Sequence, residues 1–284
     1  MPDTSLLLAL LVQSVLVPFA AAGALAWTLR HAACAPAAMA LAVAAGFLAS
    51  YMALVPGAWP WPPQSAMDWQ PWVVLASCAG ALVIDAEKRR GPRQFVARAV
   101  LGSVLGLLLV WPAVGSLGVA KAGTAALVAG VLMAGVWSLR TNARFPAGTH
   151  PLRLAAVAGG AGIALMLDSS QTAGQLSGAL AMALVACAVI GQLRATLASP
   201  AVGTVVLVLG TLLLQAHVYA GFPLGYVALL LAGTVADVVP ALLIRPGRAS
   251  SERGARVTSA LLTLVPVVAV IGMAIKTLQE SGGY

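Results

Sequence analysis

The sequence predicts an all-α integral membrane protein, a polytopic bundle of about ten transmembrane helices. Three observations lead to this prediction. The chain is 61% hydrophobic and only 8% charged, with a mean hydropathy of +0.96. Apolar runs of about 20 residues, the length that crosses a bilayer, recur from one end of the chain to the other. The basic residues between these runs fall almost entirely on one side of the topology that the runs define.

The composition leaves no room for a soluble domain. An ordinary soluble domain carries about 25% charged residues, and no stretch of this chain is both long enough and polar enough to fold in water. We therefore expect residues 1–284 to form one transmembrane domain. The first apolar run lacks the basic residues that precede the hydrophobic part of a signal peptide, so we expect it to remain as a helix.

Ten apolar runs are expected to cross the membrane. A full crossing of a hydrocarbon core of about 30 Å takes about 20 residues, and the third and sixth runs are short by this measure. Short spans are accommodated by bilayer thinning or by burial inside the bundle. The predicted spans are residues 5–28, 34–55, 71–86, 96–117, 121–139, 153–168, 173–193, 200–219, 222–244 and 257–277.

The distribution of positive charge orients these spans, because basic loops stay in the cytoplasm. Fourteen of the sixteen Lys and Arg residues flank one set of span ends, and only Lys121 and Lys276 lie at the other. With an even number of crossings, both termini are expected outside the cytoplasm. The residues expected to determine this topology lie in the loop after the third span, at Lys88, Arg89, Arg90 and Arg93. Asp85 and Glu87 beside them are expected to form solvated ion pairs.

The Ala- and Arg-rich, Lys-poor composition is typical of a bacterial protein, so the expected location is the plasma (inner) membrane. The net charge of +8 does not indicate nucleic-acid binding, because the basic residues are spread over short loops and form no continuous stripe. Anionic lipid headgroups are the expected electrostatic partner. No cofactor is expected, since the chain has no phosphate-binding, catalytic or metal-binding motif. Its three cysteines lie in apolar segments and are interpreted as buried hydrophobes.

The segment Pro56–Trp72 holds four of the seven Trp residues and five prolines, with no Lys or Arg. Proline density argues against a continuous helix. Indole rings favour the headgroup boundary, so we favour an anchor lying on the rim of the bundle. The alternative is a lid over an outward-facing cavity, with Asp68 as its one charged group.

Small residues four positions apart predict close helix contacts at Gly46–Ser50, Gly102–Gly106 and Gly174–Gly178. A weak parallel internal repeat is also present. Ala81–Ile84 is followed by a basic loop and an apolar span, and Ala241–Ile244 is followed by the same pattern 160 residues later. Parallel repeats of this kind occur in some transporters.

Asp237 is the most informative single residue, because it lies in an otherwise apolar run, eight residues before Arg245. That separation is about 12 Å along a helix. Pro240 lacks the N–H that would bond the carbonyl of Ala236, so this carbonyl and the carboxyl together are suited to a proton or a cation. The alternative is structural: Asp237 is neutral, or bonds a neighbouring helix or an Arg, and fixes packing.

A second group of polar residues gathers near the predicted outer face. Together these residues are suited to line an outer polar vestibule, with one imidazole among them. The alternative is that they are ordinary amphipathic residues at the membrane interface. The group consists of Tyr51, Asp68, Asp168, Gln215 and His217, with Gln171, Gln175 and Tyr219 nearby.

Three classes of function remain open, and we rank them in order. The first is a secondary transporter or permease for a small solute, with Asp237 as the coupling group. The second is a non-catalytic subunit or assembly factor of a membrane complex, which the scarcity of intramembrane polar groups favours. The third is a membrane-embedded enzyme acting on lipid, with Asp68, Asp168 and His217 as its candidates. The expected partners are the lipid bilayer, a small-molecule solute and other membrane subunits, and no nucleic acid.

Overall fold

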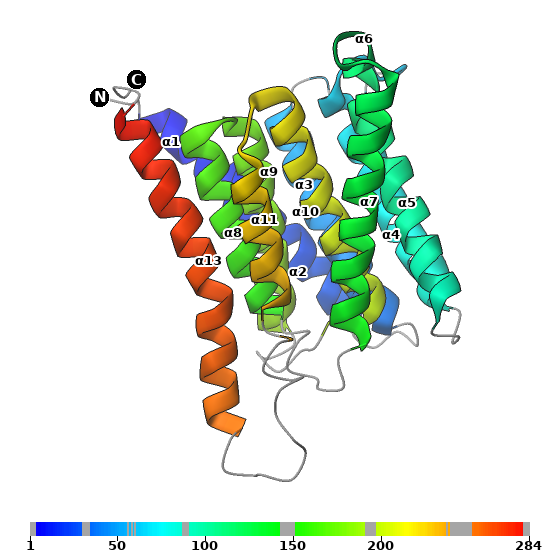
Figure 1. The fold of residues 1–284 in the computed structure, drawn as a ribbon. Helices are drawn as coiled ribbons and strands as arrows, with labels where there is room; N and C mark the ends of the chain where they lie inside the picture. Colours follow the sequence, from blue (N-terminus) through cyan, green and yellow to red (C-terminus); the bar gives the residue numbers. More distant parts are fainter. Residues whose placement is uncertain are drawn as a thin grey trace.

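The computed structural model describes residues 4–29, 35–55, 57, 59, 61–86, 91–142, 151–190, 197–236, 238 and 252–280. Every regular element in these residues is a helix (Figure 1). The predicted all-α bundle is therefore confirmed for the described part of the chain.

The first half of the chain forms five helical segments (Figure 1). Each ends where glycine, proline or a polar loop interrupts the apolar run. In order they are α1 (Thr4–Leu11), the π-helical turn η1 (Val12–Leu16) and α2 (Val17–Leu29) in one rod; α3 (Ala35–Leu54); α4 (Ala66–Ala86); α5 (Pro92–Val110), continued by the 3-10 turn η2 (Trp111–Ala113) and α6 (Val114–Leu117); and α7 (Val119–Asn142).

The second half adds a hairpin, a central helix and two further segments. These are α8 (Pro151–Asp168), α9 (Gln171–Ile190), α10 (Ser199–Ala220), α11 (Leu224–Val235) and α13 (Glu252–Glu280). Within the described residues, nine helices are long and apolar enough to cross a membrane, and they match every predicted span except the ninth. Of the ninth span, the structure describes residues 222–236 and 238, and the helix α11 takes up 12 of these. By the length and composition of these helices, the chain is a multi-pass membrane protein.

The two ends of the bundle differ in composition. The start of α1 and the end of α13 lie at the same end, as an even number of crossings requires (Figure 1). We call this the tryptophan end; α4 and α7 also begin here, and it holds Trp59, Trp61, Trp72, Lys121 and Lys276. The opposite end, where α5 and α13 begin and α7 ends, is the basic end. Its described basic residues are Arg93, Arg98, Arg140, Arg153, Arg253 and Arg256. Which end faces the cytoplasm stays a prediction, and Lys88, Arg89 and Arg90 lie outside the described residues.

Helix α4 begins at Ala66, five residues before the predicted start of the third span. A capping box starts it: the Asp68 N–H donates to Ser65 Oγ at 3.3 Å, and the Ser65 N–H donates to Asp68 Oδ2 at 2.8 Å. The predicted start of the third span at residue 71 was therefore wrong. The described residues of 57–65 are not helical, as the proline density of this segment predicts. The carboxylate of Asp68 also accepts the Gln64 N–H at 3.0 Å.

Pro71 lies inside α4 because another helix supplies the donor that it lacks. A proline at this position leaves the carbonyl of Met67 without its helical partner. The hydroxyl of Tyr51, on α3, donates to that carbonyl at 2.9 Å. Tyr51 is fully buried, so the bond is shielded from water. Sequence alone gives no indication that a tyrosine 16 positions away donates the hydrogen bond that the carbonyl of Met67 lacks.

Helix α10 is the centre of the bundle. Of its apolar window, 89% is buried, against 17–72% for the other candidate spans. It packs against α3, α4 and α7 and touches α5, α8, α9 and α11 as well. A helix that is apolar on all sides is expected in such a central position.

The three predicted small-residue pairs all lie at helix contacts. A Cβ built on Gly102 would lie 3.0 Å from the Cα of Gly130, where α5 crosses α7. A Cβ on Gly162 of α8 would lie 2.8 Å from the carbonyl oxygen of Gly174 on α9. Gly46 packs against Ala183 and the backbone of Pro18 in the same way. Close backbone approach of this kind is how small residues hold membrane helices together.

The indoles of the tryptophan end form a cluster around Trp72. The ring centroids of Trp59 and Trp61 lie 5.8 and 5.6 Å from that of Trp72. All three are at least one-third exposed, as an interfacial anchor requires. The lid alternative stays a prediction, as does the internal repeat, because Ala241–Ile244 lie outside the described residues.

Candidate functional site

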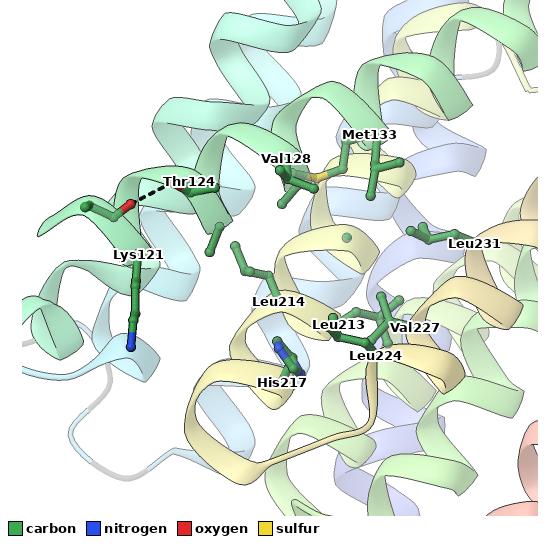
Figure 2. A pocket seen from close by; sticks show the side chains of 15 residues that line it. Lys121, Thr124, Val128, Met133, Leu213, Leu214, His217, Leu224, Val227 and Leu231 are labelled. Carbon is green, nitrogen blue, oxygen red and sulfur yellow. Dashed lines mark hydrogen bonds between the residues drawn. The ribbon is translucent and has the colours of Figure 1, made fainter. Parts of the chain in front are cut away.

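A cavity of about 500 Å³ lies between α7, α10 and α11 (Figure 2). This volume falls within the range of about 300–1,000 Å³ that is usual for small-molecule sites. Its walls are almost entirely aliphatic: Val128, Leu132 and Met133 from α7, Leu213 and Leu214 from α10, and Leu224, Val227 and Leu231 from α11. Figure 1 shows α10 passing between α11 and α7, so α10 supplies the floor of the cavity.

Two ionisable side chains, Lys121 and His217, are among the described residues that line the cavity. Both come from the tryptophan end, Lys121 from the first turn of α7 and His217 from the last turn of α10. Figure 2 shows them toward one end of the cavity, whereas Met133 lies toward the other. The cavity is therefore amphipathic along its length.

His217 is held in a defined orientation by the end of its helix. Gly221, with φ of 71°, ends α10 in the left-handed conformation, which costs glycine little. The chain then turns back, and the N–H of Phe222 donates to the carbonyl of Ala216 at 3.2 Å. Nδ1 of His217 lies 2.7 Å from the carbonyl oxygen of Phe222. Because a carbonyl only accepts, Nδ1 carries the proton, and Nε2 of the neutral ring is therefore an acceptor.

A buried polar cluster joins four helices at the basic end. The guanidinium of Arg98 on α5 binds the carboxylate of Asp85 on α4 at 2.7 Å, and both side chains are 3% exposed. Ser199 of α10 also donates to this carboxylate, and Gln94 donates to it at 3.0 Å. The expectation of a solvated ion pair at Asp85 was therefore wrong. The α4–α5 hairpin brings residues 13 positions apart into contact, and α10 covers them.

Helix α7 completes this cluster. Nη1 of Arg98 donates to Ser138 Oγ at 3.0 Å and to Thr141 Oγ1 at 3.2 Å. The guanidinium also lies 4.4 Å from the ring centroid of Trp137, a cation–π contact. Arg98 is thus a pairing residue inside the bundle rather than a solvated loop charge. Its position within an apolar run, two residues past the predicted start of the fourth span, was the indication in the sequence.

Arg140 is a second buried cation near the basic end. It is 2% exposed, and its Nη1 donates to the backbone carbonyl of Thr234 in the last turn of α11. Asp237 follows Thr234 by three positions in the sequence. Asp237 and Pro240, the predicted coupling site, lie outside the described residues, and their role stays a prediction.

The predicted outer vestibule is divided among several local roles. Tyr51 and Asp68 both bond the backbone at the start of α4. The Tyr51 hydroxyl donates to the carbonyl of Met67, and the Asp68 carboxylate accepts the N–H of Ser65. Gln215 accepts a hydrogen bond from Gln70 of α4 at 2.5 Å, inside the bundle. Asp168 is partly exposed at the end of α8. Of the predicted set, only His217 lines the cavity, and Lys121 joins it there.

In the described residues, no group of three or more His, Cys, Asp and Glu side chains is placed to hold a metal ion. Comparison of the whole sequence with protein-family models and with curated proteins found no match in either case. What the described geometry offers is an amphipathic cavity at one end of the bundle and two buried arginines near the other.

Proposed function

We propose that this protein is a secondary transporter or permease of a bacterial plasma membrane, and that its solute is small and hydrophobic. The observation that carries the proposal is the cavity between α7, α10 and α11. Three of its lining residues, Val128, Leu132 and Leu224, are about half or more exposed on the side of the bundle. In a membrane, that side is covered by lipid, so a hydrophobic solute would reach the cavity from the bilayer.

The proposed coupling group is Asp237. An acid in an apolar run is costly unless it is paired or protonated, and such acids often belong to ion or proton pathways. Arg140 offers a buried positive charge at the carbonyl of Thr234, which lies three residues before Asp237 in the sequence. In the proposed cycle, two events shift the conformational equilibrium of α11. One is protonation of Asp237, which follows α11 in the sequence, and the other is binding of solute in the cavity that α11 lines.

The test is uptake by purified protein in lipid vesicles that contain a trapped pH-sensitive dye. A panel of labelled small hydrophobic solutes is screened for saturable uptake that is accompanied by proton movement. Asp237→Asn should abolish the coupled proton flux while leaving the folded yield near wild type. Glu280→Gln, which removes an exposed acid of α13, is the matched control and should leave the flux unchanged. Equal flux in Asp237→Asn and in the wild type would refute the coupling role.

A second candidate is a non-catalytic subunit of a membrane complex, and one observation favours it. The buried hydroxyls of Thr204, Thr211 and Thr263 donate to carbonyls of their own helices, and Ser177 donates to Ala158 of the neighbouring helix. Polar groups used in this way stabilise a bundle and do not form a path for solute. Stoichiometric co-purification of another membrane protein, with loss of yield but unchanged flux in Asp237→Asn, would favour this role.

A further inference from the structure

We propose that the cavity between α7, α10 and α11 binds the acyl chain of an anionic lipid, with Lys121 and His217 at its head group. The inference rests on the proposed function only in using the same cavity, and it names the class of ligand. Its basis is the amphipathic character of the cavity, in which both ionisable residues lie toward one end.

The walls suit a hydrocarbon chain. Leu213 of α10 is 1% exposed and closes the floor, whereas Leu132 and Leu224 form the exposed rim on either side. Gly210, also in the floor, lies against Met133, so the cavity ends where α7 and α10 are in close contact. A chain lying in this space exchanges contact with mobile lipid for packing against side chains on three helices.

The length of the cavity matches one leaflet. Along α7 its lining residues run from Ala120 to Met133. Thirteen steps at about 1.5 Å each give about 20 Å, which exceeds half of a hydrocarbon core of about 30 Å. The cavity therefore extends from the headgroup level of the tryptophan end to the middle of the membrane. A lipid of that leaflet can insert a chain without leaving its own depth.

The polar groups at the mouth suit the headgroup of an anionic lipid. Lys121 is exposed in the first turn of α7, and it forms no ion pair with a carboxylate of the described residues. The other lysine of the tryptophan end, Lys276, lies 3.6 Å from Glu280. His217 donates a hydrogen bond from Nδ1–H to the carbonyl oxygen of Phe222, so Nε2 of the neutral ring is an acceptor that suits a headgroup hydroxyl, and the positive charge comes from Lys121. A lysine stem lies along apolar surface while its ammonium group reaches the headgroup layer.

The experiment measures binding of phosphatidylglycerol and phosphatidylcholine, each with a fluorescent label on one acyl chain, to the purified full-length protein in neutral detergent micelles. Fluorescence anisotropy gives the dissociation constants. Wild type should prefer phosphatidylglycerol. Lys121→Gln should raise the dissociation constant of phosphatidylglycerol about fivefold, which corresponds to about 1 kcal/mol for one lysine near an anionic surface. Lys276→Gln, a lysine at the same end but away from the cavity, is the matched control and should have no effect.

A second pair of variants tests the chain-binding part of the site. Val128→Trp places an indole in the cavity and should raise the dissociation constant of phosphatidylglycerol at least tenfold. Val131→Trp adds the same ring to an exposed position of α7 that does not line the cavity, and should bind as wild type. Elution as a single monodisperse peak shows that each variant is folded.

Several results would overturn the inference. They are equal affinity for the two lipids, equal losses in the two lysine variants, or unchanged binding in Val128→Trp. Preferential binding of phosphatidylglycerol without any coupled uptake would leave the inference standing and refute the proposed function. Coupled uptake of a neutral solute, without preference for the anionic lipid, would do the reverse.

Discussion

Replacement of Asp85 by alanine should destabilise the bundle strongly, because it leaves the charge of Arg98 buried. At 2.7 Å the pair has a Coulomb energy of about 6 kcal/mol for an effective dielectric constant of about 20. Desolvation of the two ions offsets much of this in the intact protein. Removal of one partner leaves the other charge uncompensated, which costs about 3–5 kcal/mol. The bonds from Gln94 and Ser199 to the carboxylate are lost at the same time.

The assay is reversible unfolding in mixed micelles of increasing denaturing detergent, followed by circular dichroism. Asp85→Ala should lower the free energy of unfolding by about 3–5 kcal/mol. The double variant Asp85→Leu with Arg98→Met should recover most of the loss, because it removes both buried charges together. Glu280→Gln breaks an ion pair whose side chains are 75% and 67% exposed, and it should cost about 1 kcal/mol or less. A loss in Asp85→Ala no larger than in Glu280→Gln would refute the reasoning.

Two further predictions follow from particular contacts, and a third follows from the predicted topology. Gly130→Ala should lower the free energy of unfolding by about 1–3 kcal/mol, because its Cβ would lie 2.2 Å from a side chain and 2.4 Å from the backbone of α5. Gly123→Ala is the control, and it should be near neutral in the same unfolding assay because the space around Gly123 is open. Tyr51→Phe should cost about 1–3 kcal/mol, because the buried carbonyl that its hydroxyl binds at 2.9 Å loses its donor, and thermal unfolding in detergent measures this. A cysteine at Ser65 should react with an impermeant thiol reagent added outside intact cells, and one at Ser250 should not; reaction of both from the same side would contradict the topology.

The fold could be predicted from sequence because each element is defined by a local property. A run of apolar residues of membrane length forms a helix whatever surrounds it, since unpaired backbone groups are costly in hydrocarbon. The nine long helices found in the described part of the chain follow from this rule. The start of α4 did not, because its capping box and its donor from Tyr51 depend on groups that a count of prolines does not reveal.

The candidate site could be predicted only in part, because a cavity depends on which helices become neighbours. His217 was named from its position near a span end, but Lys121 was interpreted only as a minority charge. Nothing in the spacing of α7, α10 and α11 indicates that they leave a space between them. Gln70 was missed for the same reason, since its partner Gln215 is 145 positions away.

The buried arginines change what the charge asymmetry means. Arg98 and Arg140 were counted among the fourteen basic residues that orient the chain, yet each is 2% exposed and bonded within the bundle. A buried, paired guanidinium specifies which helices meet, whereas a solvated one in a loop resists translocation. Without these two, twelve basic residues remain on the predicted cytoplasmic side, against Lys121 and Lys276 on the other. The predicted orientation therefore does not depend on them, and neutralising Arg93 should weaken it more than neutralising Arg98, which should instead loosen the packing of α4, α5, α7 and α10.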